Sequence, residues 1–133
     1  MIRVTPPCWS AEVRYAEADQ QGVVFNAHYL LYCDEAMGAF CAQHHILEFA
    51  QLVRLKTSTL TWHAPARWGD TIDVFVSVAG LGRTSVSIQF ELRVGERSCC
   101  TVDTVYVYAD DAGAPQPIPD TIRQVLLPEN DTR

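Results

Sequence analysis

A carboxylate, a glycine and the start of a predicted helix follow one another near the N-terminus. Asp19 stands in a polar turn over residues 16–22, and Gly22 can adopt the positive φ that such a turn needs. The first turn of a helix offers N–H groups without acceptors and a partial positive charge, which can hold an oxyanion. A nearby carboxylate can act as nucleophile or as general base for water. The stretch therefore predicts an acyl-transfer site; the alternative is that Asp19 is only a turn or capping residue.

The helix that would position these groups is predicted over residues 26–43. Its apolar residues recur at spacings of three and four, and Asn26 suits the N-cap position. Other apolar side chains fill the remaining faces, so we expect a buried helix. His44 and His45 follow its end, where we expect solvated or capping side chains rather than catalytic ones. The recurring apolar residues are Tyr29, Leu30, Cys33, Met37, Phe40 and Cys41.

Most of the remaining chain is predicted to form strands. A loosely alternating segment over residues 8–15 suits a first strand, and four β-rich runs follow, separated by turns that contain glycine or proline. The connections are short, so we expect most strands to pair with antiparallel neighbours. A short helix is expected over residues 120–127. The four β-rich runs cover residues 52–63, 71–78, 83–94 and 97–108.

One early helix and about five long strands predict an α+β fold. A long curved antiparallel sheet wrapped around one central helix satisfies this pattern. A single sheet covers only one side of the helix, and the outer strands keep unpaired edges. We therefore expect a homodimer, in which a second copy of the chain covers these surfaces.

The composition limits the classes of function. The length predicts one domain over residues 1–133, and 10 basic against 16 acidic side chains give a net charge of −6 at pH 7. Such a chain has no electrostatic basis for binding nucleic acid or anionic lipid over a broad face. No apolar run approaches the ~20 residues of a membrane span, and the N-terminus lacks the apolar core of a signal peptide. The interpretation is a soluble cytoplasmic protein.

The cysteines are predicted to be buried thiols rather than metal ligands. Their number is odd, two of them are adjacent, and no C-x-x-C or His-x-His spacing is present. In a reducing compartment such residues behave as small apolar side chains. We therefore expect no metal site. The five are Cys8, Cys33, Cys41, Cys99 and Cys100.

The stretch Asp19-x-x-Gly22-Val23-Val24-Phe25-Asn26-x-x-Tyr29 resembles the signature of hotdog-fold acyl-CoA thioesterases. The branch it resembles contains 4-hydroxybenzoyl-CoA thioesterase and the Tol-Pal-associated short-chain acyl-CoA thioesterase. The resemblance continues along the chain in order, so together it is specific. Further matching segments are Asp34-x-Ala36, residues 63–70, residues 82–85 and residues 117–119.

The resemblance implies roles for individual residues. Asp19 falls on the family's catalytic carboxylate, and Tyr15 and Tyr29 fall on positions that line the same site. The family's CoA contacts lie at a strand start, and its active sites lie at a dimer interface, with many members pairing dimers into tetramers. No cofactor is implied, since CoA is part of the substrate. The loop whose N–H groups face the thioester corresponds to Gly22, Val23, Val24, Phe25 and Asn26, and the CoA-contacting strand start to Arg83, Thr84 and Ser85.

Three residues depart from the branch pattern. Asn26 stands where the short-chain branch usually has histidine, Glu17 replaces the first acid of Asp-x-Asp, and Met37 replaces a common arginine. His28 lies about 200° around the helix from Asn26, so it cannot take over that position. The class of enzyme survives these changes, but the acyl group is left open between short-chain and aromatic.

Several alternatives stay open. Asp34 or Glu35 could supply the carboxylate from the helix instead of Asp19, and Arg83 could be a solvated strand-end charge rather than a phosphate ligand. Arg14 and Lys56 are weaker candidates for a phosphate. A thioesterase acting on acyl chains bound to carrier protein, or a non-enzymatic acyl-CoA-binding protein, would share the same fold.

Overall fold

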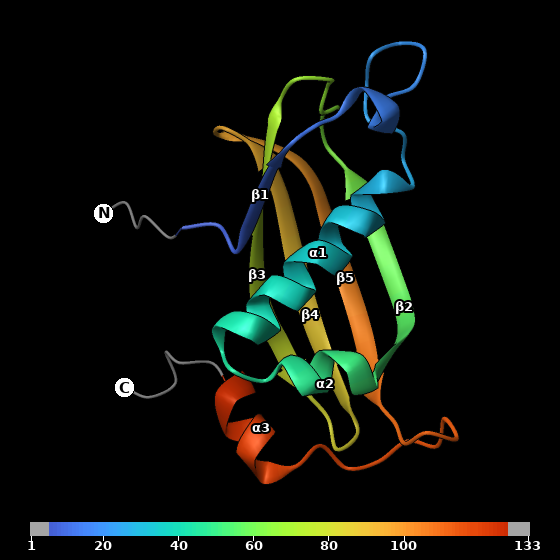
Figure 1. The fold of residues 1–133 in the computed structure, drawn as a ribbon, viewed down its shortest axis with the longest axis vertical. Helices are drawn as coiled ribbons and strands as arrows, with labels where there is room; N and C mark the ends of the chain where they lie inside the picture. The colour runs from blue at the N-terminus through green and yellow to red at the C-terminus, as the bar shows by residue number, and fades with distance from the viewer. Residues whose placement is uncertain (1–5, 128–133) are drawn as a thin grey trace.

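A curved sheet wraps one long helix in the computed structural model, which describes residues 6–127 (Figure 1). The sheet is antiparallel, in the strand order β1-β3-β4-β5-β2. This arrangement confirms the predicted α+β architecture. In chain order the elements are β1 (Trp9–Glu12), a 3₁₀ turn (Tyr15–Glu17), α1 (His28–Gln43), α2 (Leu47–Leu52), β2 (Val53–Trp62), β3 (Thr71–Leu81), β4 (Ser85–Val94), β5 (Arg97–Tyr108) and α3 (Asp120–Leu126).

The strand pairing follows the chain order only in part. Strands β3, β4 and β5 pair with their sequence neighbours, as the short connections predict. Strand β2, however, pairs with β5 and not with β3. The connection over residues 63–70 therefore crosses the end of the sheet. Strands β1 and β2 form the two edges of the sheet.

The core lies between α1 and the face of the sheet that α1 covers. Cys33 and Ala36 from the helix and Val74, Ile88 and Phe90 from the sheet are completely or almost completely buried there. The helical spacing places the first pair on one face of α1, while the two-residue period of a strand brings the others onto one face of the sheet. Burying a side chain of the size of Phe90 is worth roughly 1.5–3 kcal/mol, so this layer holds the helix in place.

Helix α1 differs from its prediction in two respects. It begins at His28, and the N-cap residue is Ala27, which makes no side-chain capping bond. The expectation that Asn26 caps the helix is therefore wrong. Within one chain the helix is also buried on one face only, since Leu31 and Asp34 are exposed. Among residues 6–127, nothing covers the apolar side chain of Leu31 fully, and it is 49% exposed.

The end of α1 turns sharply into α2, which the sequence did not predict. The N–H of Ile46 donates to the carbonyl of Cys41 over 2.8 Å, and the N–H of His45 donates to Ala42 over 3.2 Å. These two bonds form the Schellman arrangement, in which the residue at C′ takes the left-handed conformation that favours glycine. Here that residue is His45, with φ 61°. The six residues of α2 are too few to show a helical period.

We expect His45→Gly to raise the free energy of unfolding by up to about 1 kcal/mol, because glycine adopts this φ without a Cβ clash. Unfolding in urea would measure the change. The matched control is His45→Ala, which removes the same imidazole but keeps the Cβ, and which should bring no such gain. Equal stabilities of the two variants would contradict the assignment of strain to the backbone.

Candidate active site

Asp19 lies in a tight loop that leads from the 3₁₀ turn to α1. Its N–H donates to the carbonyl of Val23 over 2.8 Å, and its carbonyl accepts the N–H of Gly22 over 3.0 Å. Gly22 has φ 81°, a value that confirms the predicted positive φ. One carboxylate oxygen, Oδ1, accepts the N–H groups of Gln21 at 2.8 Å and Val23 at 3.4 Å. Within residues 6–127 the other oxygen, Oδ2, has no hydrogen-bond donor, and the residue is exposed.

A second loop, over residues 63–70, holds the Asp19 loop in place. The N–H of Val24 donates to the carbonyl of Ala66 over 2.8 Å, and the N–H of Trp68 donates to Gly22 over 3.0 Å. The buried hydroxyl of Tyr29 accepts the N–H of Ala66 over 3.2 Å. Tyr29 therefore connects α1 to this second loop through a buried hydrogen bond.

The backbone N–H groups around the start of α1 are not equivalent. Those of Val24 and Phe25 are engaged, the first with Ala66 and the second with the carbonyl of Glu17 over 2.9 Å. The N–H groups of Asn26 and Ala27 have no acceptor in the part of the chain that the structure describes. Orphan donors at a helix start are the groups that can receive a developing negative charge. Of the five positions predicted for the oxyanion site, only Asn26 keeps a free N–H among the described residues, and Ala27, which was not predicted, adds a second.

Exposed aromatic side chains lie on the two loops and near the start of α1. Tyr15 is 74% exposed, and its ring lies 5.1 Å from that of Trp68 in an edge-to-face arrangement. Phe25 is also exposed, with its ring centroid 6.2 Å from the ring of His28. Exposed apolar groups gathered in this way are typical of surfaces that bind a ligand or a partner.

Glu17 has a structural role that the sequence did not predict. It is only 5% exposed, whereas from the sequence it was only a departure from the Asp-x-Asp pattern. Its carboxylate accepts the hydroxyl proton of Tyr32 over 2.9 Å and the N–H of Arg14 over 2.9 Å. The guanidinium of Arg14 also contacts this carboxylate: its Nε donates to Oε2 over 2.9 Å, and its Nη2 lies 2.7 Å from Oε2 in an ion pair. The spacing Arg14-x-x-Glu17 was the one local signal that could have indicated this pair.

These contacts shift the pKa values of both partners. Burial by itself would raise the pKa of Glu17, but the hydrogen bonds from Arg14 and Tyr32 and the charge of Arg14 outweigh it and lower that pKa. Burial, the hydrogen bond to Glu17 and its negative charge raise the pKa of Tyr32. The carboxylate is therefore held ionised, and the phenol is held protonated.

Arg83, Thr84 and Ser85 lie at the other end of the sheet. The turn between β3 and β4 contains the first two, and β4 begins at Ser85 rather than at residue 83 as predicted. The carbonyl of Arg83 accepts the N–H of Ile118, and that of Thr84 accepts the N–H of Tyr108. Figure 1 shows this turn at the end of the sheet opposite to the loop that carries Asp19. The ten residues of β4 alone span about 33 Å. One chain does not bring the two predicted parts of the site together.

Asp34, the alternative carboxylate, lies on the exposed side of α1. Partial burial of its carboxyl group and the charge of Glu35 raise its pKa. A raised pKa is compatible with proton transfer, so Asp34 stays an alternative.

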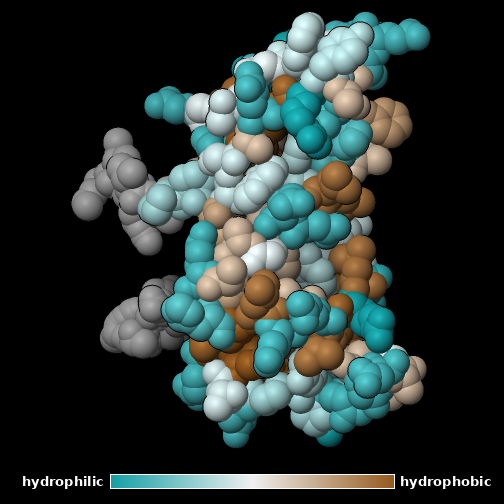
Figure 2. Space-filling view, viewed as in Figure 1, coloured by the Kyte–Doolittle hydropathy of each residue, from teal (hydrophilic) through white to brown (hydrophobic). Residues whose placement is uncertain are grey.

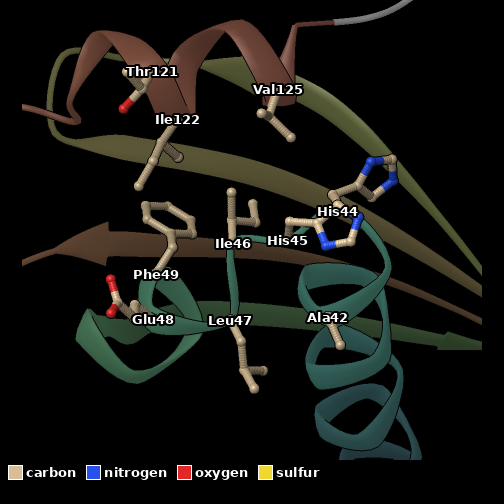
Figure 3. A pocket seen from close by; sticks show the side chains of 10 residues that line it. All are labelled: Ala42, His44, His45, Ile46, Leu47, Glu48, Phe49, Thr121, Ile122 and Val125. Carbon is tan, nitrogen blue, oxygen red and sulfur yellow. The ribbon is translucent and has the colours of Figure 1, made fainter.

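A hollow lies away from the loop of Asp19. It has a volume of about 850 Å³ and is bounded by the end of α1, by α2 and by α3. Figure 3 shows Ile46 and Phe49 facing Ile122 and Val125 across it, with two histidine rings at one edge. None of the residues predicted for the site lines it. A smaller hollow of about 310 Å³ lies beside the Arg14–Glu17 pair.

Two negative findings concern residues 6–127 alone. They contain no group of three or more His, Cys, Asp or Glu side chains placed to hold a metal ion. In the same range, no helix has both the length and the apolar character needed to cross a bilayer.

Known proteins resemble this chain over most of its length. A family model described as the Thioesterase superfamily matches residues 21–101, more than half of the chain, and begins two residues after Asp19. A thioesterase of Thermus thermophilus, solved with coenzyme A and Zn, has a TM-score of 0.81 and 26% identity, with 89% of both chains covered. This likeness confirms the predicted hotdog fold.

Two sequence relatives are named as acyl-CoA thioester hydrolases. That of Zymomonas mobilis, itself named as uncharacterized, is 29% identical over 76 residues, which cover 57% of this chain and 49% of that protein. YbgC of Escherichia coli is 25% identical over 83 residues, which cover 59% of this chain and 62% of YbgC. The chain thus spans about half of the first relative and less than two thirds of the second.

We expect Glu17→Gln to destabilise the protein near neutral pH and to matter progressively less in acid. A carboxyl group whose folded pKa is lowered contributes stability above its unfolded pKa of about 4.3 and loses it as the pH falls through the folded value. Urea unfolding from about pH 6 to about pH 3 would measure the gap between wild type and variant. The control is Glu96→Gln, at an exposed turn. A gap for Glu17→Gln that stays constant with pH would contradict the pairing.

Proposed function

Because the chain belongs to the Thioesterase superfamily, we propose that it hydrolyses the thioester of an acyl-CoA to a free acid and CoA. The acyl group is short-chain or aromatic. The observation that carries the proposal is the carboxylate of Asp19, with one oxygen free of donors, on the loop that leads to the acceptor-free amides of Asn26 and Ala27. A base or nucleophile and an oxyanion site are the two groups that acyl transfer from a thioester requires.

The reaction proceeds in one of two ways from the same carboxylate. As nucleophile, Asp19 forms a bond from Oδ2 to the thioester carbon, and the C–S bond breaks to release CoA as a thiolate. Water then hydrolyses the resulting anhydride and regenerates the carboxylate. As general base, Asp19 instead takes a proton from the attacking water, and the thiolate leaves from the tetrahedral intermediate. In both routes the N–H groups of Asn26 and Ala27 stabilise the oxyanion, and one such donor is typically worth roughly 3–4 kcal/mol of barrier.

The named relatives support CoA as the carrier of the acyl group. Two of them are acyl-CoA thioester hydrolases by name, and the Thermus protein was solved with coenzyme A. A carrier-protein thioesterase would present the same acyl-transfer groups, so a panel of acyl-CoA and acyl-carrier-protein substrates separates the two. Absence of thiol release from every substrate would instead favour an acyl-CoA-binding protein.

The site is completed by a second copy of the chain. Strand β2 pairs with β5 on one side only, so its outer edge carries unpaired backbone groups. Leu55 and Trp62 of this strand are 55% and 47% exposed. Figure 2 shows apolar side chains along the side of the molecule where Figure 1 places β2. A two-fold pairing of β2 with its copy would turn the partner's β3–β4 turn toward the end of the sheet where Asp19 lies. Dimers of this kind could then pair into tetramers.

We expect Asp19→Asn to lower kcat roughly 10²–10⁴-fold, because the amide can neither attack the thioester nor take a proton. Free thiol released from a panel of acyl-CoAs measures the effect, and circular dichroism checks the fold. Asp103→Asn, on the exposed side of β5, is the matched control and should keep wild-type turnover. Near-wild-type activity of Asp19→Asn on every substrate would rule out Asp19 as the catalytic group.

The shared site makes a separate prediction for mixed dimers. If Asp19 of one chain works with Arg83 of its partner, Asp19→Asn and Arg83→Ala are each impaired, but a dimer of one of each keeps one intact site. Mixing equal amounts after unfolding and refolding should restore about a quarter of wild-type activity. Mixed samples no more active than the average of the two variants would show that the site does not combine these residues from two chains.

A further inference from the structure

We propose that Glu17 is a positioning residue, which together with Arg14 and Tyr32 fixes the loop of Asp19 against the start of α1. This inference rests on the proposed function for its effect on catalysis. The anchoring itself rests on contacts between described residues and can be measured without any substrate.

The carboxylate of Glu17 is engaged at both oxygens by its own contacts. Oε1 accepts the N–H of Arg14 and the hydroxyl of Tyr32, each over 2.9 Å. Oε2 accepts the Nε–H of the same arginine over 2.9 Å and lies 2.7 Å from its Nη2 in an ion pair. Three of the roughly four lone-pair positions of the carboxylate thus receive hydrogen bonds. Protonation of Glu17 would weaken these contacts, whereas Asp19 has an oxygen free of donors among the described residues.

Glu17 connects the two parts of the proposed site through different atoms. Its side chain reaches α1 at Tyr32, and its backbone carbonyl accepts the N–H of Phe25 over 2.9 Å. Phe25 immediately precedes the acceptor-free amide of Asn26. In the other direction along the chain, Asp19 is only two residues away, and the intervening Ala18 forms a β-bridge with Val24. Glu17 thus contributes to the position of the carboxylate relative to the amides, together with the contacts of Gly22 and Val24 to the second loop.

The hydroxyl of Tyr32 makes the side-chain part of this connection. Among the described residues it makes the only side-chain hydrogen bond from α1 to the segment over residues 14–25. Its ring is held separately by Trp9, at 5.9 Å, and by Tyr29, at 6.3 Å. Tyr32→Phe should therefore leave the ring in place and remove only the hydrogen bond. Misplacement of reacting groups by about 1 Å can cost about 10²-fold in rate.

The test uses Tyr32→Phe beside Tyr106→Phe in the full-length protein. The side chain of Tyr106 is buried, and its hydroxyl, which is not itself fully buried, makes no hydrogen bond among the described residues, so its variant controls for loss of a tyrosine hydroxyl that makes no such contact. We expect Tyr32→Phe to lower kcat about ten- to a hundredfold with KM little changed, and Tyr106→Phe to leave kcat near wild type. Equal losses in both variants, or no loss in either, would overturn the positioning role.

Variants of Glu17 separate the effect of its negative charge from the effect of its side-chain length. Glu17→Gln loses the negative charge and one acceptor oxygen, so it should lose more activity than Tyr32→Phe. Glu17→Asp keeps the charge on a side chain one methylene shorter, so it should recover part of that activity. Recovery by Asp no better than that by Gln would contradict the role of the ionised carboxylate. If Glu17→Gln does not fold, Tyr32→Phe and Glu17→Asp decide the outcome.

Hydrogen exchange distinguishes failure of this inference from failure of the proposed function. In Tyr32→Phe the Phe25 amide should exchange about tenfold faster than in wild type, while amides in the centre of β4 keep their rates. A wild-type protein that releases no thiol from any acyl-CoA would overturn the proposed function and leave exchange at Phe25 to decide the anchoring. Unchanged exchange at Phe25 would overturn the anchoring even in an active enzyme.

Discussion

The packing of a single helix against a five-stranded sheet is the constraint on which the rest of the structure depends. The inner face of α1 is fixed by the spacing of side chains such as Tyr29, Ala36 and Cys41, all fully or almost fully buried. That packing decides where the helix begins, and the amides of Asn26 and Ala27 come directly before it. The loops over residues 18–25 and 63–70 then meet at this point, so the core places the proposed oxyanion site. The same arrangement leaves the outer side of α1 and the edge of β2 without cover inside one chain.

Much of the fold was predictable because helices and strands leave a local periodicity of apolar residues in the sequence. Alternation gave the bounds of β5 without error and placed the start of β4 within two residues, and the spacing of apolar residues identified α1. The pairing of β2 with β5 was not predictable in this way, since a pairing between distant strands leaves no local pattern. Helix α2 was missed because six residues cannot show a period of 3.6. The Asn26 cap failed for a related reason: a good capping residue close to a helix start does not fix the first residue of the helix.

The residue types of the candidate site could be predicted from the sequence better than their arrangement in space. A carboxylate and a positive-φ glycine before a helix are local features, and the structure has them at Asp19 and Gly22. Which amides are free depends on distant acceptors such as Ala66, and the sequence does not reveal those. The hydrogen bonds to the carboxylate of Glu17 likewise include one from Tyr32, which is fifteen residues away in the sequence. The distance between Asp19 and Arg83 follows from topology, and it is what makes a second chain part of the proposed site.

Glu17 and Asp19 lie two residues apart but have different surroundings. This difference affects the charge that CoA, the proposed substrate's carrier, meets at an acidic chain. The net charge of −6 disfavours a polyanion at long range, but screening at physiological salt limits that effect to about 8 Å. Within that range the charge of Glu17 is offset by Arg14 at 2.7 Å, so Asp19 is the one unpaired acid of residues 14–25. A thioester approaching the start of α1 then meets a single negative charge, carried by the group proposed to attack it, and backbone dipoles that favour the oxyanion. The pairing of Glu17 with Arg14 thus lowers the negative charge that the proposed anionic substrate would meet beside Asp19, in addition to holding the loop.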